Sequence, residues 1–403
     1  MDIITAANKE SALLSSLESN QVSDVYTYRL LANLPNASRS IWTVSPNIAP
    51  SGTSHGKDCV FKLPRYGLLQ RAVIQSTLVV AGDSTFANAT NIGERIFSNI
   101  DLRSNSKVIT SNSPAYLRVR CDNASSEVAH TMSLITQESA TMSTATVTTY
   151  TPVHLPFFEK SSNYLDLEFV DQLELACVVN SSAEMGLTQD LTSATFVLYL
   201  FFRNLSNEAR RAYEAKNFSP DRPLNMLIYD QYVETFPITA AASSVVANLN
   251  VPHAVFATHF FVNKGLTGST TGQVNTGPSN QITSYSLAFT GRTILNTIPD
   301  YVMKYDGASY KISGDTCDRS GAITKRNAAT GRPSPISLYW GESNDRTYNS
   351  HAVAMSNINN PQLTVNFTAL AAGTPGQLTV VHEYWKLLTI SSDDGRLDVG
   401  FSL

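Results

Sequence analysis

The sequence of 403 residues has few charged side chains and no long apolar run. Charged residues make up 15% of the chain and the formal net charge is −4, so we do not expect the molecule as a whole to bind a polyanion, although local basic spots are compatible with this balance. No apolar run approaches the roughly twenty residues of a membrane-spanning helix. The first residues carry no basic segment followed by an apolar core, so we expect no secretory signal.

Cysteine is also scarce. Cys59, Cys121, Cys177 and Cys317 are widely spaced and form no Cys-x-x-Cys pair. This spacing argues against a disulfide framework and against a zinc site. We therefore expect reduced thiols in core or strand positions, and a protein that is made inside a cell.

The familiar motifs of enzymes are missing as well. The chain has no phosphate-binding loop, no dinucleotide fingerprint, no His-Glu-x-x-His and no Gly-x-Ser-x-Gly. We predict that the protein is not an enzyme, and we assign no catalytic, cofactor-binding or metal-binding residue and no cofactor.

Two pairs of residues that contain histidine are candidates for a catalytic or metal-binding site. His382 and Glu383 are adjacent in an expected strand, so they face opposite sides of a sheet and we interpret them as structural. His253 and His259 could share a face, as two metal ligands would. No third ligand stands at a recognisable spacing, so core or edge histidines are the favoured interpretation.

Charged clusters have equally ordinary explanations. Asp166, Glu168 and Glu174 could be glycosidase carboxylates, but we expect them on the solvent face of half-buried strands. The other two clusters are interpreted as a solvated basic loop and a turn; they are Lys325, Arg326 and Arg332, and Asp393, Asp394 and Arg396.

The stretch 163–216 organises the rest of the chain. Leu165, Leu167 and Phe169, and then residues 173–179, show the alternation of half-buried strands. The run Phe196–Phe202 is apolar at every position, which predicts a central strand covered on both faces. Ser206 is a suitable N-cap, so a helix is predicted over 206–216.

Further strands are predicted on both sides of this stretch. They are residues 41–80 with breaks at Pro and Gly, 92–108, 226–235, 244–251, 255–262, 284–290, 363–367 and 377–390. A helix is expected to start at Pro114. Long polar loops are expected at 137–151, 265–280 and 301–335.

These patterns predict an all-β chain of two similar β-sandwiches. The domains are an N-terminal arm at 1–40, a first sandwich at 41–218 that ends in the helix 206–216, and a second sandwich at 219–403. The arm either packs on its own domain or reaches a neighbouring subunit or an inner surface.

Three stretches resemble double jelly-roll major capsid proteins of large DNA viruses, virophages and Polinton-like viruses, the last most of all. The apolar strand Phe196–Phe202 followed by Glu208-Ala209-Arg210-Arg211 is similar to the junction between the two jelly rolls. Val251-Pro252-His253 before the strand 255–262 is similar to the entry of the second jelly roll, although the family more often has His before Pro. The ending Val399-Gly400-Phe401-Ser402-Leu403 resembles the family's Gly-containing tail.

The resemblance implies two tandem eight-stranded jelly rolls with short helices and long loops. It implies a major capsid protein of the virion, whose homotrimeric pseudo-hexagonal capsomers tile an icosahedral shell assembled inside the host cell. The partners would be further copies, penton and minor capsid proteins, and an inner membrane if one exists, without sequence-specific nucleic-acid binding. The alternatives are a secreted glycan-binding or glycan-processing protein with two jelly-roll domains, and a minor or penton capsid component.

Overall fold

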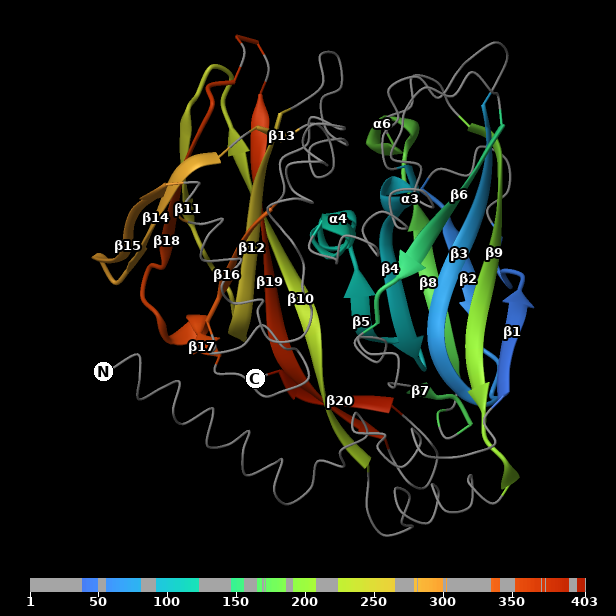
Figure 1. Cartoon of the computed structure of the whole chain (residues 1–403). Helices are drawn as coiled ribbons and strands as arrows, with labels where there is room; N and C mark the ends of the chain where they lie inside the picture. Colours follow the sequence, from blue (N-terminus) through green and yellow to red (C-terminus); the bar gives the residue numbers. More distant parts are fainter. Residues whose placement is uncertain are drawn as a thin grey trace.

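The structure is a computed structural model, and it describes residues 38–49, 56–80, 92–122, 146–155, 165–168, 170, 172–185, 191–207, 224–264, 279–280, 282–299, 302, 335–340, 352–370, 372–373, 375–390 and 397–402. Regular structure in these ranges is mainly β-strand, in four antiparallel sheets (Figure 1). The predicted all-β class is confirmed. No helix in these ranges is long and apolar enough to cross a membrane.

The first half of the chain forms two facing sheets. Its strands are β1 (Ser38–Val44), β2 (Asp58–Lys62), β3 (Leu68–Val80), β4 (Phe97–Ser104), β5 (Lys107–Asn112), β6 (Thr146–Val153), β7 (Leu165–Asp166), β8 (Leu173–Val179) and β9 (Leu191–Asn204). One sheet has the order β1-β9-β3-β6, with β7 beside β3, and the other has the order β2-β8-β4-β5. Short helices lie between strands, namely α3 (Ile92–Arg95), α4 (Pro114–Asp122) and α6 (Ser182–Met185).

The second half repeats this arrangement. Its elements are β10 (Leu224–Ile238), β11 (Ser244–Asn248), β12 (Ala254–Lys264), β13 (Ser279–Asn280), β14 (Ile282–Phe289), β15 (Arg292–Pro299), β16 (Ile336–Tyr339), β17 (Val353–Ala354), η2 (Met355–Asn357), β18 (Gln362–Phe367), β19 (Gly376–Ile390) and β20 (Leu397–Ser402). One sheet has the order β10-β19-β12, with β13, β16 and β17 on β12 and β20 on β19. The other has the order β11-β18-β14-β15.

In both halves the opening strand lies beside a late strand, which in turn lies beside the third strand. The second strand opens the other sheet in the same way. This connection of two antiparallel sheets is the jelly-roll topology. The prediction of two tandem jelly rolls is therefore confirmed.

Alternation of side chains explains which faces are buried. Leu173, Leu175 and Cys177 of β8 point into the first core, and Leu363 and Val365 of β18 point into the second, as the period of two predicts. Strand β9 lies centrally between β1 and β3, as predicted. Only one of its faces is fully buried, because Val197, Tyr199 and Phe201 stay half-buried on the other.

The predicted polar loop 137–151 is wrong for its second part. Residues from Thr146 belong to β6, which pairs with β3 over eight positions from Ala72 to Val79. Val147, Thr149 and Thr151 are buried on one face. Threonine is β-branched and favours a pleated strand, so a Thr-rich sequence can form a strand without an apolar pattern. Residues 137–145 lie outside the described ranges.

The predicted helix start at Pro114 is confirmed. The backbone N–H of Tyr116 donates to the Ser113 hydroxyl, so Ser113 caps α4 and Pro114 takes the first helical position. At the second predicted helix, Asn207 is helical after Ser206, and 208–216 lie outside the described residues. The arm up to residue 37, the loop 265–278 and most of 301–335 also lie outside them.

Two of the four cysteines can be placed. Cys59 and Cys177 are buried, free and directly opposite each other in β2 and β8. The neighbouring bond from Val179 N–H to Lys57 O sets the register, so by alternation Cys59 and Cys177 form a hydrogen-bonded pair. Cβ atoms of such a pair are about 5.5 Å apart, more than a disulfide spans. The predicted core thiols are confirmed at these two positions.

Candidate functional site

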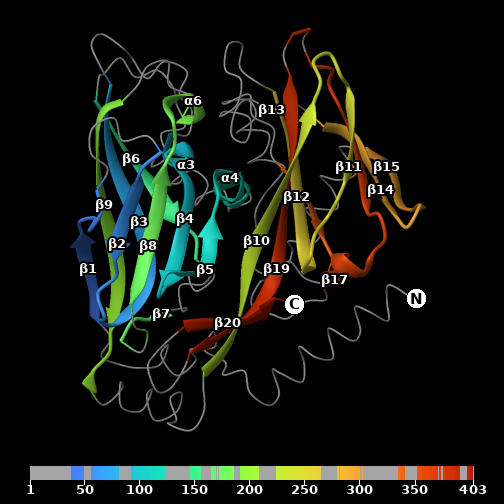
Figure 2. The ribbon, with the colours of Figure 1, turned by 180° about the vertical axis from the view of Figure 1, so that it is seen from behind.

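A buried network of hydrogen bonds and a cluster of aromatic side chains lie at the junction between the two jelly rolls. Helix α4 and strand β5 of the first half lie against β10, β19 and β12 of the second (Figures 1 and 2). Ala115, Tyr116 and Val119 of α4 form one buried cluster with second-half side chains that include Phe256 and Trp385. The helix therefore covers the outer face of the β10-β19-β12 sheet.

Arg118 ties the same helix to β12. Its guanidinium lies 4.0 Å from the ring centroid of Phe261, and its Nη1 donates to Asn263 Oδ1 at 2.6 Å. Arg118 is fully buried. A buried cation over an aromatic face contributes about 2 kcal/mol when it is desolvated, so this contact helps to fix α4 on the sheet.

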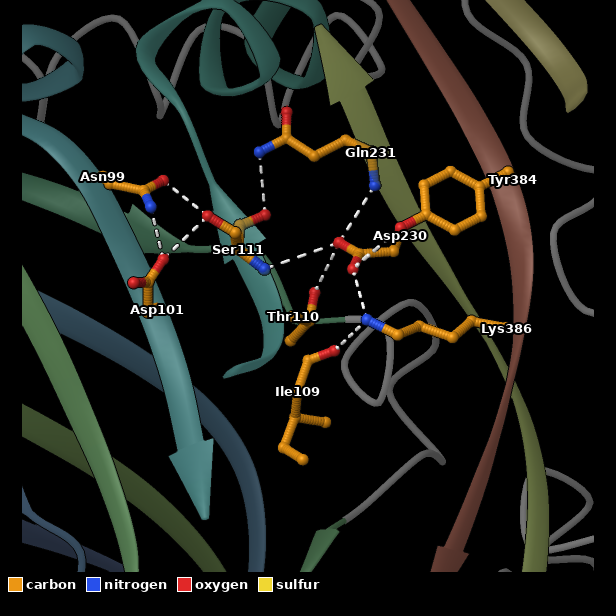
Figure 3. A network of polar contacts seen from close by, with 9 residues as sticks. All are labelled: Asn99, Asp101, Ile109, Thr110, Ser111, Asp230, Gln231, Tyr384 and Lys386. Carbon is orange, nitrogen blue, oxygen red and sulfur yellow. Dashed lines mark hydrogen bonds and ion pairs between the residues drawn. The ribbon is translucent and has the colours of Figure 1, made fainter. Parts of the chain in front are cut away.

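Asp230 of β10 is the centre of the polar network in Figure 3. Its Oδ1 accepts hydrogen bonds from Thr110 Oγ1 at 3.1 Å and from the Ser111 and Gln231 backbone N–H groups at 3.4 and 2.9 Å. Its Oδ2 lies 2.8 Å from Lys386 Nζ. The carboxylate thus joins β5 of the first half to β10 and β19 of the second.

Lys386 makes the reciprocal contact. Its Nζ also donates to the Ile109 carbonyl of β5 at 2.7 Å, while the Tyr384 hydroxyl donates to Asp230 Oδ2 at 3.4 Å. Burial, with Asp230 nearby, raises the pKa of Tyr384 above its usual range. The phenol therefore stays protonated and remains a hydrogen-bond donor.

The network continues into the first half. The Ser111 hydroxyl lies 2.8 Å from Asp101 Oδ1 and 2.5 Å from Asn99 Oδ1, and Arg103 pairs with Asp101 Oδ2 at 2.8 Å. Gln231 donates through Nε2 to the Ser111 carbonyl at 2.8 Å. It also accepts from the Ser113 hydroxyl at 2.9 Å. Side chains from β4 to β19 are connected without a break.

The apolar cores also cross the junction. Ile228 and Leu388, from β10 and β19, belong to the core cluster of the first half. Leu378 and Val380, on the same side of β19, belong to the second core. One long strand therefore supports both jelly rolls, which is compatible with the twist of a 15-residue strand. Polar and apolar contacts therefore both join the two sandwiches at this junction.

The structure places His382 and Glu383 on opposite faces of β19, as predicted. His382 Nε2 lies 3.2 Å from Glu234 Oε2, and Glu383 Oε2 lies 3.6 Å from His259 Nε2. Both residues are fully buried. Each is part of a separate polar contact within the sheet.

His253 and His259 are not brought together. The His253 ring stacks on Tyr384 at 3.8 Å, whereas His259 Nδ1 lies 2.8 Å from Ser337 Oγ. In β19, Tyr384, on which His253 stacks, and Val381, which pairs with His259, face opposite sides of the sheet. No group of three potential metal ligands occurs in the described part of the chain.

The solvent-face interpretation of the three carboxylates is wrong for Asp166. Asp166 is buried and its Oδ1 accepts the Glu168 backbone N–H at 3.0 Å, while Glu168 Oε1 accepts the Gly67 N–H at 2.9 Å. Asp166 ends the two-residue β7 and Glu168 lies in the bend that follows, so the alternation of a continuing strand does not apply. Glu168 and Glu174 are half-buried. Residues 325, 326, 332, 393, 394 and 396 lie outside the described ranges.

The sequence reasoning missed the residues of the junction. Asp230 and Lys386 are charges of opposite sign inside two long apolar strand segments. Charged side chains are seldom buried unless they are paired. Such interruptions are the signal that could have identified the pair.

The comparisons bear on the fold. A structure of PBCV-1 VP54 fitted into a reconstruction of the virophage Sputnik matches with a TM-score of 0.65 and 12% identity, covering 91% of this chain and 98% of that one. The Faustovirus major capsid protein matches at 0.59 and 8% identity, covering 87% and 90%. The mavirus major capsid protein matches at 0.56 and 12% identity, covering 92% and 93%.

No protein-family model and no curated protein sequence matches the chain. The solved structures that it resembles are viral capsid proteins, and the likeness extends over nearly the whole length of both partners. With the strand orders described above, the chain has the double jelly-roll fold of those proteins.

Proposed function

We propose that this protein is a major capsid protein whose homotrimers form pseudo-hexagonal capsomers of an icosahedral virus shell. The observation that carries the proposal is the double jelly roll with its buried junction, matched along at least 87% of this chain by three capsid proteins. Two sandwiches joined by buried contacts are a suitable building block for a flat tile. The protein would act in the virion and have no catalytic role.

The uncovered surfaces support association between copies. Exposed apolar side chains occur on and near β1 in the first half, at Ile41, Trp42, Ile48 and Tyr66; Trp42 stacks on Tyr66, and Ile41 is on the other face of β1. In the second half the exposed apolar side chains are Val246 of β11, Ile294 of β15 and Val302. Strand β1 and the β11-β15 sheet are at opposite flanks of the molecule in both views. Two different sets at opposite flanks favour a head-to-tail contact, which closes into a ring if the rotation permits.

The internal junction suggests which surfaces meet. Within the chain, the outer face of β10-β19-β12 is covered by α4 of the first half. The equivalent face of the first half, on β1-β9-β3-β6, leaves Val197, Tyr199 and Phe201 half-buried. We propose that the β11-β18-β14-β15 side of the next copy covers it. Three copies then give six sandwiches in a ring.

The finer features of this proposal concern domains and partners. We propose the division into an arm at 1–40, a first jelly roll at 41–218 and a second at 219–403. Capsomers would then contact one another, penton and minor capsid proteins, and an inner membrane if the virus has one. Weak contacts suffice between capsomers, because each one touches several neighbours.

The test is the mass and shape of the purified protein. Size exclusion with light scattering is expected to give three times the 43.9 kDa of one chain, and negative-stain images are expected to show hexagonal particles. Monomers would contradict the proposal and favour a glycan-binding protein, and pentamers would indicate a penton component.

A matched pair of variants locates the contact. Ile41→Glu places a charge on β1, where the native side chain is 62% exposed and little folding energy is at stake. Trimers are expected to dissociate. Val108→Glu is the control, because Val108 is 41% exposed and belongs to neither set. Equal loss of trimer in both variants would refute this placement of the contact.

A further inference from the structure

Strand β16 is a short element that one strand, β12, holds by backbone pairing and by side-chain contacts on both faces. It comprises Ile336–Tyr339 and pairs with β12 between Ala257 and Phe260. Trp340 follows, and its backbone N–H donates to the Phe256 carbonyl at 2.9 Å. Ser337 and Tyr339 point to one face of the sheet, and Leu338 and Trp340 to the other. His259 contacts Ser337 on the first face, and His382 is linked to Trp340 through Thr258 on the second.

On the core side, a chain of hydrogen bonds crosses the whole sheet. Trp340 Nε1 donates to Thr258 Oγ1 at 3.0 Å, and Thr258 Oγ1 lies 3.0 Å from His382 Nδ1. His382 Nε2 lies 3.2 Å from Glu234 Oε2, and Glu234 Oε1 accepts the Asn250 N–H at 2.9 Å. The relay Trp340–Thr258–His382–Glu234 thus connects β16 to β12, β19 and β10.

The chemistry of the four groups fixes the direction of this relay. An ionised carboxylate only accepts hydrogen bonds, so the His382 Nε2 carries the proton that faces Glu234. In the neutral ring Nδ1 is then an acceptor, and the Thr258 hydroxyl donates to it. The indole of Trp340 only donates, so it supplies the bond to the Thr258 oxygen. Every member is satisfied only while His382 is neutral.

A second proton on His382 disrupts this order. Nδ1 becomes a donor, so Thr258 Oγ1 faces two donors and its own proton loses its acceptor. Thr258 is 1% exposed and His382 is 0% exposed, so no solvent replaces the lost bond. A buried polar hydrogen without an acceptor is costly. Thr258 Oγ1 can still accept from both donors, so the bond that is lost is the one its own hydroxyl donates. Detachment of Trp340 and β16 admits water, which supplies the missing acceptor.

The opposite face holds β16 by a different contact. His259 Nδ1 lies 2.8 Å from Ser337 Oγ, its Nε2 lies 3.6 Å from Glu383 Oε2, and its ring meets Tyr339 edge-on at 5.9 Å. Protonation of His259 would give an ion pair with Glu383 and leave Nδ1 able to donate to Ser337. Acid therefore does not oppose this contact, and the response belongs to the His382 side.

We propose that β16 and Trp340 form an acid-released strap, in which protonation of His382 leaves the Thr258 proton without an acceptor and thereby favours detachment of this edge of the second jelly roll. The inference concerns the folded chain and does not depend on the capsid role. In this proposal His382 is more than a buried side chain of the sheet, because its protonation state controls whether β16 stays attached.

The direction of the His382 pKa shift agrees with release of the strap in acid. Burial lowers the pKa of His382 below its usual value, although the hydrogen bond and charge of Glu234 on β10 oppose this. The other titratable side chains on this face are Tyr232 of β10, which is opposite His382, Tyr384 of β19, and His253 at the entry to β12. Burial also lowers the pKa of His253. A group with a lowered folded-state pKa favours the closed strap above about pH 6.5. Closure is lost as the pH falls from there toward the folded-state pKa.

The test is hydrogen exchange of the purified full-length protein at pH 7.5, 6.5 and 5.5. Protection of residues 336–340 is corrected for the intrinsic exchange rate and divided by that of β8 in the same sample. One linked proton changes an opening constant at most about tenfold per pH unit. We expect up to about a tenfold relative loss of protection between pH 6.5 and 5.5.

Three variants make the result specific. His382→Gln keeps a donor and an acceptor but cannot titrate, and it is expected to abolish the acid response. Thr258→Val removes the relay, so protection is expected to be low and independent of pH. His259→Gln is the control on the other face and should retain the wild-type response. An unchanged wild-type ratio, or an equal acid response in His382→Gln, would overturn the proposal.

Discussion

The two jelly rolls have the same strand order but differ in how the equivalent sheet is covered. In the second half, β10, β19 and β12 are packed under α4, with Phe256 and Trp385 buried. In the first half, the outer face of β1-β9-β3-β6 remains half-buried. The comparison shows that strand order does not decide burial. Within the chain, the second sheet is covered because the segment that carries α4 packs on it.

The open β1-β9-β3-β6 sheet and the covered β10-β19-β12 sheet also differ in their charges. Strands β1, β9, β3 and β6 contain Arg39, Arg71 and Arg203 and no acidic residue. Strands β10 and β19 contain charges of both signs, which include the pair Asp230 and Lys386. Opposite charges are paired where the chain buries a sheet against itself. One sign persists where the surface remains open.

The largest expected effect breaks the junction. Asp230→Ala leaves Lys386 buried without its partner and removes acceptors for Thr110 and Ser111. Loss of one member of a buried ion pair costs about 3–5 kcal/mol. Urea unfolding followed by circular dichroism should show this loss. The double variant Asp230→Leu with Lys386→Met should recover part of it, and a double variant as unstable as Asp230→Ala would count against a central role for the charge pair.

A smaller effect separates the two cores along one strand. Leu388 and Leu378 of β19 are both fully buried, but Leu388 belongs to the first core and Leu378 to the second. Each change to Ala should cost about 2–5 kcal/mol. Hydrogen exchange should show loosening of β8 for Leu388→Ala and of β18 for Leu378→Ala. Identical exchange patterns would mean that the cores respond as one unit.

The smallest effect probes the open face. Tyr199→Phe removes the hydrogen bond from Tyr199 Oη to Gln75 Oε1 of 2.8 Å on the half-buried side of β9. The net loss in one chain is about 1 kcal/mol, measured by thermal unfolding at low protein concentration. If another copy covers this face, trimers should dissociate at lower urea than wild type. An unchanged trimer midpoint would argue against that cover.

Local periodicity accounts for most of the correct predictions. Leu363, Val365 and Phe367 face one core because side chains of a strand alternate, whichever sheet it joins. The same reasoning failed at Asp166, where the strand ends after two residues. It also failed at Thr149 and Thr151, since buried threonines give no apolar pattern.

The sequence by itself determined the strand content, the start of α4 at Pro114, the position of β9 inside its sheet and the placement of His382 and Glu383 on opposite faces of a strand. These depend on neighbours a few residues away. Only the tertiary structure decided that Asp230 meets Thr110, across 120 residues, and that His382 is linked to Trp340. Such contacts depend on sheet register and on the packing of one sandwich against the other. No local pattern contains that information.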